Sequence, residues 1–172
     1  MIEVNRVNRC DWAEGSEMYI EYHDREWGVP VFDDKTLFEF LILETAQAGL
    51  SWTTILKRKE NYRTAYDHYN IEKIASYGED RRNELLDNEG IIRNKLKINA
   101  SINNAKRVLE IKDEYGSFSQ YLWSFTDYKP VINKWETLSE VPAETELSKT
   151  IAKDLKKEGF KFVGAVTIYA FL

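Results

Sequence analysis

The chain has 172 residues, a formal net charge of −5 and a single cysteine. This length fits one domain, or two small lobes that share a cleft. The net charge argues against a protein that coats nucleic acid non-specifically, although it is compatible with a local basic face. A lone cysteine excludes an internal disulfide, and the sequence shows neither a membrane-spanning apolar run nor the apolar core of a signal peptide. We therefore expect a cytoplasmic protein that does not enter a membrane.

Residues 1–18 are predicted to form an irregular lead-in, which an aromatic stretch then follows. This stretch, MYIEYHDREWGVP, covers residues 18–30. Within it Tyr19, Tyr22 and His23 have the spacing that places side chains on one face of a helix. The group could be mere packing, or it could line a pocket, since tyrosine provides both a flat ring and a hydroxyl.

A strongly apolar helix is predicted next. Either Asp33 or Asp34 can act as its N-cap, and the helix should run to about Ala48. A helix that is apolar almost all round is normally buried, yet Glu44 lies near its inner end. A buried carboxylate is costly unless it is paired, hydrogen-bonded or protonated. Glu44 is therefore either a structural ion-pair partner or a functional group.

A bend between two helices is predicted directly after this carboxylate. Gln47 and Gly49 point to a turn, and Ser51 can cap a new helix that starts with Trp52. A carboxylate, an amide and an indole near one bend suit recognition of a flat, polar, aromatic ligand such as a nucleobase. The alternative is that Glu44 pairs with a nearby arginine or lysine and that Trp52 fills the core.

The remainder of the chain is predicted to be helical, because no segment shows sustained strand alternation. The helix that begins after Ser51 becomes basic over residues 57–59. Further helices are expected at 62–68, 71–76, 79–88, 93–115, 118–125, 146–158 and 164–172, with a long connection over 126–146. The predicted fold class is accordingly all-α.

A short turn between the last two helices is bracketed by Gly159 and Gly164, which is the form of a helix–hairpin–helix element. Glycine lets the backbone come close to a phosphate, and the N–H groups that start the next helix can bind the anion. The lysines near this turn are Lys149, Lys153, Lys156, Lys157 and Lys161. Residues 90–97, where three basic side chains follow a glycine, are a weaker second example. The alternative is an ordinary helix C-cap and connection.

Five stretches, taken together, carry the pattern of one family. They are CDW at 10–12, YIEYHDREWGVP at 19–30, LFEFLILETAQAGLSWTTILKRKENYR at 37–63, GIIRNKLKI at 90–98 and GFKFVG at 159–164. In these stretches the sequence resembles the type I DNA-3-methyladenine glycosylases, members of the helix–hairpin–helix superfamily. The similarity covers essentially the whole chain. It implies two helical lobes around a base-binding cleft, which we expect to form a single domain over residues 1–172.

The resemblance also implies roles for individual residues. Glu44 is similar to the family's base-binding carboxylate, and Tyr22 to its pocket tyrosine; these two are the catalytic candidates. Trp12 and Trp52 look like the stacking walls of the base pocket. The further substrate-binding candidates are Tyr19, Trp27 and Gln47. The DNA-binding candidates are Gly49, Leu50 as a plug for the gap left by the flipped nucleotide, Lys157, Gly159, Lys161 and Gly164.

A structural zinc ion is the cofactor that the resemblance raises. Cys10 and His23 match the first two ligands of the family's zinc site, whose other two ligands come from a tail beyond the final helix. This chain stops at Leu172, and two ligands fall short of a closed tetrahedral site. Either the tail is missing or this member binds no zinc; in the second case Cys10 is a small apolar residue and His23 a hydrogen-bonded polar one. The family's usual Gly-Gln after the glutamate is replaced by residues 45–46, which could reshape the pocket floor.

The resemblance therefore implies a monofunctional enzyme that flips and excises 3-methyladenine from alkylated duplex DNA. It would release the free base and leave an abasic site, because no lysine next to Glu44 in the sequence suggests Schiff-base chemistry. We expect a monomer. Two alternatives stay open: a non-catalytic helix–hairpin–helix protein that binds DNA or a nucleobase, and a small helical enzyme that acts on free nucleobases or nucleosides.

Overall fold

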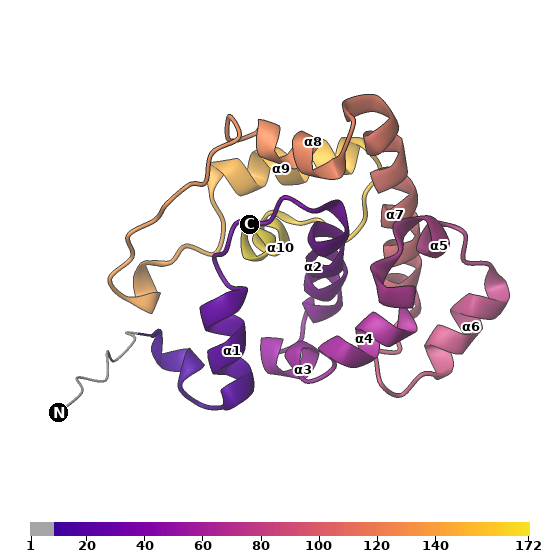
Figure 1. Cartoon of the computed structure of the whole chain (residues 1–172), viewed down its shortest axis with the longest axis horizontal. Helices are drawn as coiled ribbons and strands as arrows, with labels where there is room; N and C mark the ends of the chain where they lie inside the picture. Colours follow the sequence, from indigo (N-terminus) through magenta and orange to yellow (C-terminus); the bar gives the residue numbers. More distant parts are fainter. Residues whose placement is uncertain (1–8) are drawn as a thin grey trace. The chain divides into compact units, whose positions relative to one another are not determined.

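The computed structural model describes residues 9–172, and in this part of the chain all regular structure is helical, with no strand (Figure 1). The predicted all-α fold class is confirmed. The chain divides into two compact units, which we describe separately. Among the described residues, the N-terminal unit comprises residues 9–30 and 134–141, and the main unit comprises residues 31–133 and 142–172. That the two form a single domain over residues 1–172 stays a prediction.

The N-terminal unit is built around one helix of nine residues. Its elements are η1 (Asp11–Ala13), α1 (Glu17–Arg25) and η3 (Leu138–Glu140). The Ser16 hydroxyl accepts a hydrogen bond from the Tyr19 N–H at 3.3 Å and so caps α1 at its N-terminus. α1 thus begins within residues 1–18, the segment that was predicted to be irregular. Residues 1–8 of that segment lie outside the described part of the chain.

The main unit holds the remaining helices. They are α2 (Asp34–Gln47), α3 (Trp52–Leu56), α4 (Lys59–Ala65), η2 (Asp67–Tyr69), α5 (Ile71–Ala75), α6 (Glu79–Asp87), α7 (Lys95–Tyr115), α8 (Phe118–Ser124), α9 (Glu146–Lys157) and α10 (Ala165–Phe171). Most lie within a few residues of their predicted bounds. In the described residues no helix combines the length and the apolarity needed to cross a membrane.

Two predicted helices differ from the structure. The helix that starts at Trp52 ends at Leu56, so Lys57 and Arg58 lie between α3 and α4, and Lys59 is the first residue of α4. The predicted helix at 62–68 is interrupted, because three consecutive residues of η2 have left-handed backbone angles, with φ between 48° and 58°. The Asp67 carboxylate there accepts a hydrogen bond from the Tyr77 hydroxyl at 2.6 Å, a contact that local sequence patterns do not reveal.

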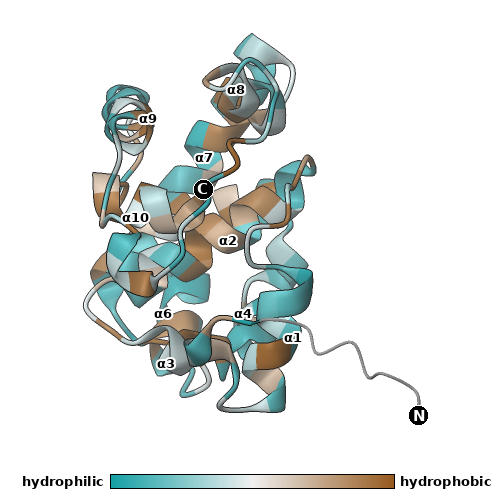
Figure 2. Ribbon diagram, turned by 90° about the vertical axis from the view of Figure 1, so that its left-hand side faces the viewer, coloured by the Kyte–Doolittle hydropathy of each residue, from teal (hydrophilic) through white to brown (hydrophobic). Residues whose placement is uncertain are grey.

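α2 is the central helix of the main unit. It contacts α3, α4, α7, α8 and α10, and Figure 1 shows it between α7 and α10. The Asp33 side chain accepts a hydrogen bond from the Thr36 N–H at 2.8 Å and caps the helix, as predicted. Phe38, Leu41 and Leu43 are at most 1% exposed, and each contributes about 1.5–3 kcal/mol by burial. Brown, hydrophobic ribbon accordingly follows much of α2 in Figure 2.

Candidate active site

Glu44 lies in the last turn of α2 as a buried carboxylate with an open acceptor. Glu44 is 5% exposed, and its Oε2 atom has no hydrogen-bond partner among the described residues. Burial raises the pKa of this carboxyl from 4.5 to about 7. Within residues 9–172 the alternative of an ion pair with an arginine or lysine is not found. An acceptor that the fold leaves unpaired is a functional candidate, because a bound N–H donor would satisfy it.

A second buried carboxylate on the same helix shows what a structural role looks like. Glu39 is 6% exposed, and its carboxylate lies 3.3 Å from the Arg63 guanidinium and 3.7 Å from the Lys59 ammonium. Two cations therefore neutralise Glu39 where it is buried. The contrast with Glu44 identifies the carboxylate at the bend, not the one near the helix middle, as the functional candidate.

The bend after Glu44 is a type II β-turn. The Leu50 N–H donates to the Gln47 carbonyl oxygen at 2.6 Å, Ala48 has φ −44° and ψ 115°, and Gly49 has φ 77°. The positive φ explains the glycine, since side chains rarely tolerate that conformation. Leu50 is 40% exposed at the end of the turn, which is compatible with its predicted role as a plug.

The helix that follows the bend begins as the sequence predicts. The Ser51 hydroxyl accepts a hydrogen bond from the Thr54 N–H at 3.3 Å and caps α3. Trp52 is the first residue of α3 and is partly buried against the hydrophobic core. Gln47 is also partly buried. The structure therefore brings Glu44, Gln47 and Trp52 to the two sides of one turn, while their roles in binding a base stay predictions.

Lys97 is a residue of this bend that sequence reasoning missed. Its ammonium donates to the Ala46 carbonyl oxygen at 2.8 Å and to the Ala48 carbonyl oxygen at 2.6 Å. Lys97 is 9% exposed, and burial lowers its pKa. Its grouping with a surface phosphate site in residues 90–97 is therefore wrong. A signal was available, because Lys97 shares a helical face with the buried residues Ser101 and Asn104.

The N-terminal unit gathers the aromatic side chains that the sequence singled out. The Trp12 ring lies 5.8 Å from the Tyr19 ring, 6.2 Å from Tyr22, 5.3 Å from His23 and 5.3 Å from Trp27, measured between centroids. The predicted grouping of Tyr19, Tyr22 and His23 is confirmed. Tyr22 is buried, whereas Trp27 is 46% exposed. Stacking of a base on Trp12, and the catalytic role of Tyr22, stay predictions.

The two zinc-ligand candidates lie next to each other in the same unit. The Cys10 backbone N–H donates to Nε2 of His23 at 3.4 Å, and Nδ1 of His23 lies 3.0 Å from the Asp24 carboxylate. Hydrogen bonds from Arg9 and then from His23 lower the pKa of Asp24 to about 2. Residues 9–172 contain no group of three or more His, Cys, Asp or Glu side chains that could hold a metal. Cys10 and His23 alone therefore do not make a closed zinc site, which needs four ligands.

The hairpin between α9 and α10 is held in place by the hydrophobic core and by a side chain of α7. Phe160 and Val163 are 2% and 1% exposed and pack in the core of the main unit. Gly159 has φ 84°, and the Asn103 amide donates to its carbonyl oxygen at 2.9 Å. A side chain at Gly159 would also approach Arg107 to 3.2 Å. Gly159 is therefore explained by the fold itself, as a helix C-cap requires.

Gly164 has no such internal explanation. Its φ of −69° and ψ of 158° suit any residue, and a Cβ atom placed on it would meet nothing within 4 Å. Neither backbone strain nor packing inside the described chain therefore requires glycine at this position. A partner that approaches the backbone closely from outside would require it.

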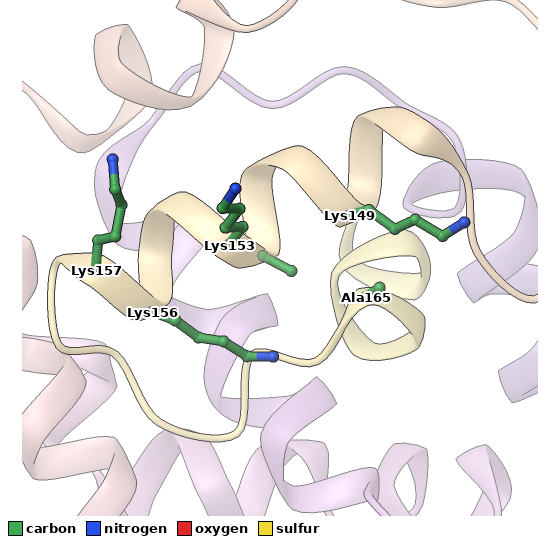
Figure 3. Close-up of a pocket in the computed structure, with 6 residues that line it drawn as sticks. Lys149, Lys153, Lys156, Lys157 and Ala165 are labelled. Atoms are coloured by element: carbon green, nitrogen blue, oxygen red, sulfur yellow. The ribbon is translucent and has the colours of Figure 1, made fainter.

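A lysine face lies on α9 beside this hairpin. It surrounds an open groove of about 500 Å³. The groove is lined by Lys149, Ala152, Lys153, Lys156, Lys157 and Ala165 (Figure 3). Lys149 pairs with Glu146 at 2.9 Å and Glu144 at 3.5 Å, and Lys157 pairs with Asp154 at 3.5 Å. Lys153 and Lys156 form no ion pair with the described residues, so their charges are available to an anionic partner.

Comparisons with known proteins agree with these features. Residues 12–172 match the family model described as methyladenine glycosylase. The chain is 44% identical to the DNA-3-methyladenine glycosylase of Haemophilus influenzae over 96% of its length and 90% of the relative's. It is 43% identical to DNA-3-methyladenine glycosylase 1 of Escherichia coli, over 96% of this chain and 89% of that one.

Solved structures give the same result for the fold. A crystal structure of 3-methyladenine DNA glycosylase I superposes with a TM-score of 0.92 at 46% identity, over 95% of this chain and 90% of that one. A structure that addresses 3-methyladenine recognition by the Staphylococcus aureus glycosylase I has a TM-score of 0.92 at 39% identity, over 96% and 88% of the two chains.

Proposed function

The chain belongs to the methyladenine glycosylase family, and we propose that it hydrolyses the N-glycosidic bond of 3-methyladenine in alkylated DNA. The products are free 3-methyladenine and an abasic site, so the protein is a DNA-repair hydrolase. The observation that carries this function is the buried Glu44 carboxylate, whose Oε2 atom the described residues leave without a partner.

The reaction needs little from the protein in the way of acid catalysis. Methylation at N3 gives the adenine ring a positive charge, so the base leaves readily. Water attacks the sugar carbon C1′, the bond from C1′ to the base breaks, and its electron pair neutralises the ring. The proton of the attacking water passes to solvent. The protein's task is to extract the base, hold it and exclude normal bases.

Glu44 supplies the discrimination in this scheme. In a buried site a carboxylate binds a cationic ring through charge-assisted hydrogen bonds, and it gains far less from neutral adenine. Because burial raises the pKa of Glu44 to about 7, a positive ligand also favours the ionised form that binds it. Glu44 acts as a recognition group and needs no covalent step.

Water rather than an amine is the nucleophile, so the enzyme is monofunctional. Lys97 is the lysine that the structure brings to the bend, and two carbonyl oxygens hold its ammonium group. An ammonium group held in this way would have to break both hydrogen bonds and lose a proton before it could attack C1′. The engagement of Lys97 by the backbone of the bend therefore favours water as the nucleophile.

The base reaches the site by flipping out of the duplex. Flipping costs a few kcal/mol and costs least for damaged bases, while stacking on an aromatic ring returns about 1–3 kcal/mol. Leu50, exposed on the type II turn, fills the gap. The turn at Gly164 approaches a phosphate closely, and Lys157 and Lys161 contact the backbone. The lysine face of α9 extends this contact through Lys153 and Lys156.

We further expect a cytoplasmic monomer, because DNA repair on a duplex gives no reason for two-fold symmetry and a lone cysteine suits a reducing compartment. Light scattering of the purified chain tests the oligomeric state.

The decisive test is release of methylated base from alkylated duplex DNA, followed by chromatography of the free base. Purified protein is expected to release 3-methyladenine and to leave the strand uncut until alkali is added. DNA binding without base release would favour the non-catalytic alternative. Hydrolysis of a free nucleoside without duplex binding would favour an enzyme of nucleosides. Strand cleavage without alkali would refute the monofunctional mechanism.

A further inference from the structure

We propose that Lys97 is a positioning residue for base excision: its ammonium group fixes the bend after Glu44 in the shape that DNA requires. The inference rests on the proposed function, because the shape of this bend matters for catalysis only if a flipped base is bound beside it. Lys97 acts through the backbone of the bend, so its role is to position and not to react.

The ammonium completes the hydrogen bonding at the end of α2. The last carbonyl groups of a helix have no partner within it and need another donor. Lys97 donates to the Ala46 and Ala48 carbonyl oxygens, and the Leu50 N–H donates to the Gln47 carbonyl oxygen that lies between them. Three consecutive carbonyl groups are thus engaged, and the turn cannot change shape without losing one of these bonds.

The charge of Lys97 serves this bend alone. Burial is the one influence that shifts its pKa, and the described part of the chain offers it no ion-pair partner. A cation is stabilised at the C-terminus of a helix by the aligned peptide dipoles, and α2 has 14 residues. The fold thus buries the Lys97 ammonium group against two backbone carbonyl oxygens. An apolar side chain at this position would avoid the free-energy cost of desolvating a charge.

The long helix α7 holds the ammonium group in place. The Asn94 side chain accepts hydrogen bonds from the N–H groups of Leu96 and Lys97, at 2.9 and 3.1 Å, so the backbone of Lys97 is itself fixed. α7 also packs against α2, and its buried side chains, which include Ile98 and Ile102, belong to the hydrophobic core of the main unit. Lys97 therefore ties the bend to the most extended rigid element of the main unit.

What depends on this tie is the placement of Leu50, whose N–H closes the turn by donating to the Gln47 carbonyl oxygen. A reacting group misplaced by about 1 Å can lose about a hundredfold in rate. Loss of the ammonium frees the Ala46 and Ala48 carbonyl groups and loosens the turn, while Glu44 stays in the helix one turn earlier.

The test compares Lys97→Met, which keeps most of the side-chain stem, with Lys106→Met, at an exposed lysine of the same helix. Lys97→Met is expected to lower kcat/KM for excision from alkylated duplex about 10- to 100-fold, and to weaken binding of free 3-methyladenine less than threefold. Lys106→Met is expected to change neither by more than twofold. Wild-type excision by Lys97→Met, or an equal loss of both measured quantities, would overturn the inference.

A double-mutant cycle with Leu50→Ala shows whether Lys97 acts through the bend. If it does, the two losses in excision are less than multiplicative, because a loose turn no longer places Leu50. Fully multiplicative losses would contradict the inference.

Hydrogen exchange separates this inference from the proposed function. The Leu50 N–H is expected to exchange at least tenfold faster in Lys97→Met, while buried amides of α7, such as that of Val108, keep their wild-type rates. Lys97→Gln, which retains a donor, is expected to recover part of the protection and serves if Lys97→Met does not fold. This measurement needs no substrate, so it decides the role of Lys97 even if the wild-type chain releases no base. Unchanged exchange at Leu50 in both variants would overturn the inference.

Discussion

Asn104 binds the backbone of Lys161 with both ends of its amide. Its Oδ1 atom accepts from the Lys161 N–H at 2.8 Å, and its Nδ2 atom donates to the Lys161 carbonyl oxygen at 3.0 Å. Asn104 is 1% exposed on α7, whereas Lys161 is exposed at the tip of the hairpin. A buried amide thus shapes the turn that we assign to DNA phosphates.

Replacing this amide is expected to weaken both the fold and DNA binding. Asn104→Ala leaves two backbone groups of the hairpin without partners, which should lower the free energy of unfolding by about 1–3 kcal/mol. The variant should also bind duplex DNA several-fold more weakly at a temperature where it remains folded. Urea unfolding and fluorescence anisotropy measure the two effects. Asn103→Ala is the matched control: it removes the hydrogen bonds from Asn103 to the Gly159 carbonyl oxygen and to Asn104 Oδ1 but keeps the two bonds of Asn104 to Lys161, so it should lose less of each.

Glu44→Gln is expected to abolish most excision and to leave the fold intact. A hydrogen bond to a charged group contributes about 1.5–3 kcal/mol, so excision of 3-methyladenine should fall about 10- to 100-fold. Single-turnover base release measures the loss. Glu60→Gln, at a carboxylate that is 80% exposed, is the control and should act at the wild-type rate. Unchanged release by Glu44→Gln would remove the assigned role.

Excision should depend on pH through Glu44. Its pKa is about 7 in the folded protein, and the ionised form binds the cationic base. The value of kcat/KM on alkylated duplex is therefore expected to rise about tenfold per unit below pH 7 and to level off above it. Glu44→Gln should show no such rise. A wild-type profile that is flat between pH 5 and pH 8 would contradict this assignment.

The ionisation of Glu44 should also lower the free energy of unfolding as the pH rises. Its folded pKa of about 7 lies above the ordinary value of 4.5, so the folded protein binds more protons between these values than the unfolded chain. The contribution of Glu44 to stability is present below pH 4.5 and is lost by about pH 7, and it amounts to about 3 kcal/mol. Urea unfolding at pH 5 and pH 8 should show a smaller decline in Glu44→Gln. An identical decline in both proteins would show that other groups cause it.

The lysine face should contribute to DNA binding through its unpaired members. Each phosphate contact adds about 0.9 to the slope of log K against log salt concentration, so Lys153→Ala combined with Lys156→Ala should reduce that slope by about 2. Lys149→Ala is the matched control, because Glu144 and Glu146 already neutralise that charge, and its effect should be well below one unit. Equal effects of all three lysines would mean that net charge alone controls binding.

Local signals in the sequence predicted the elements that frame the site. The caps at Asp33 and Ser51 each bond an N–H group three residues away, so the information for them is local. The position of Glu44 after an apolar run identified it as a costly buried group, and the structure shows the open acceptor that this reasoning required. The glycine after α9 likewise has the positive φ of a C-cap.

The contacts that sequence reasoning missed join distant segments. Lys97 bonds to carbonyl groups 49 and 51 residues earlier, and Asn104 bonds to a residue 57 positions later. Neither pairing follows from helical periodicity, which places a residue on a face but does not identify what that face meets. The left-handed run at η2 was missed for the same reason, since its hydrogen bond to Tyr77 spans ten residues.

The engaged carbonyl groups at the end of α2 determine which partner must deform. A turn whose carbonyl oxygens are already hydrogen-bonded before DNA binds changes its conformation little. The deformation that binding requires would therefore occur in the DNA duplex. Under the proposed function, such a turn would favour damaged bases, because these cost the least to flip out of the duplex. The search for damaged bases would then be governed by how easily each site opens, rather than by any closing motion of the protein.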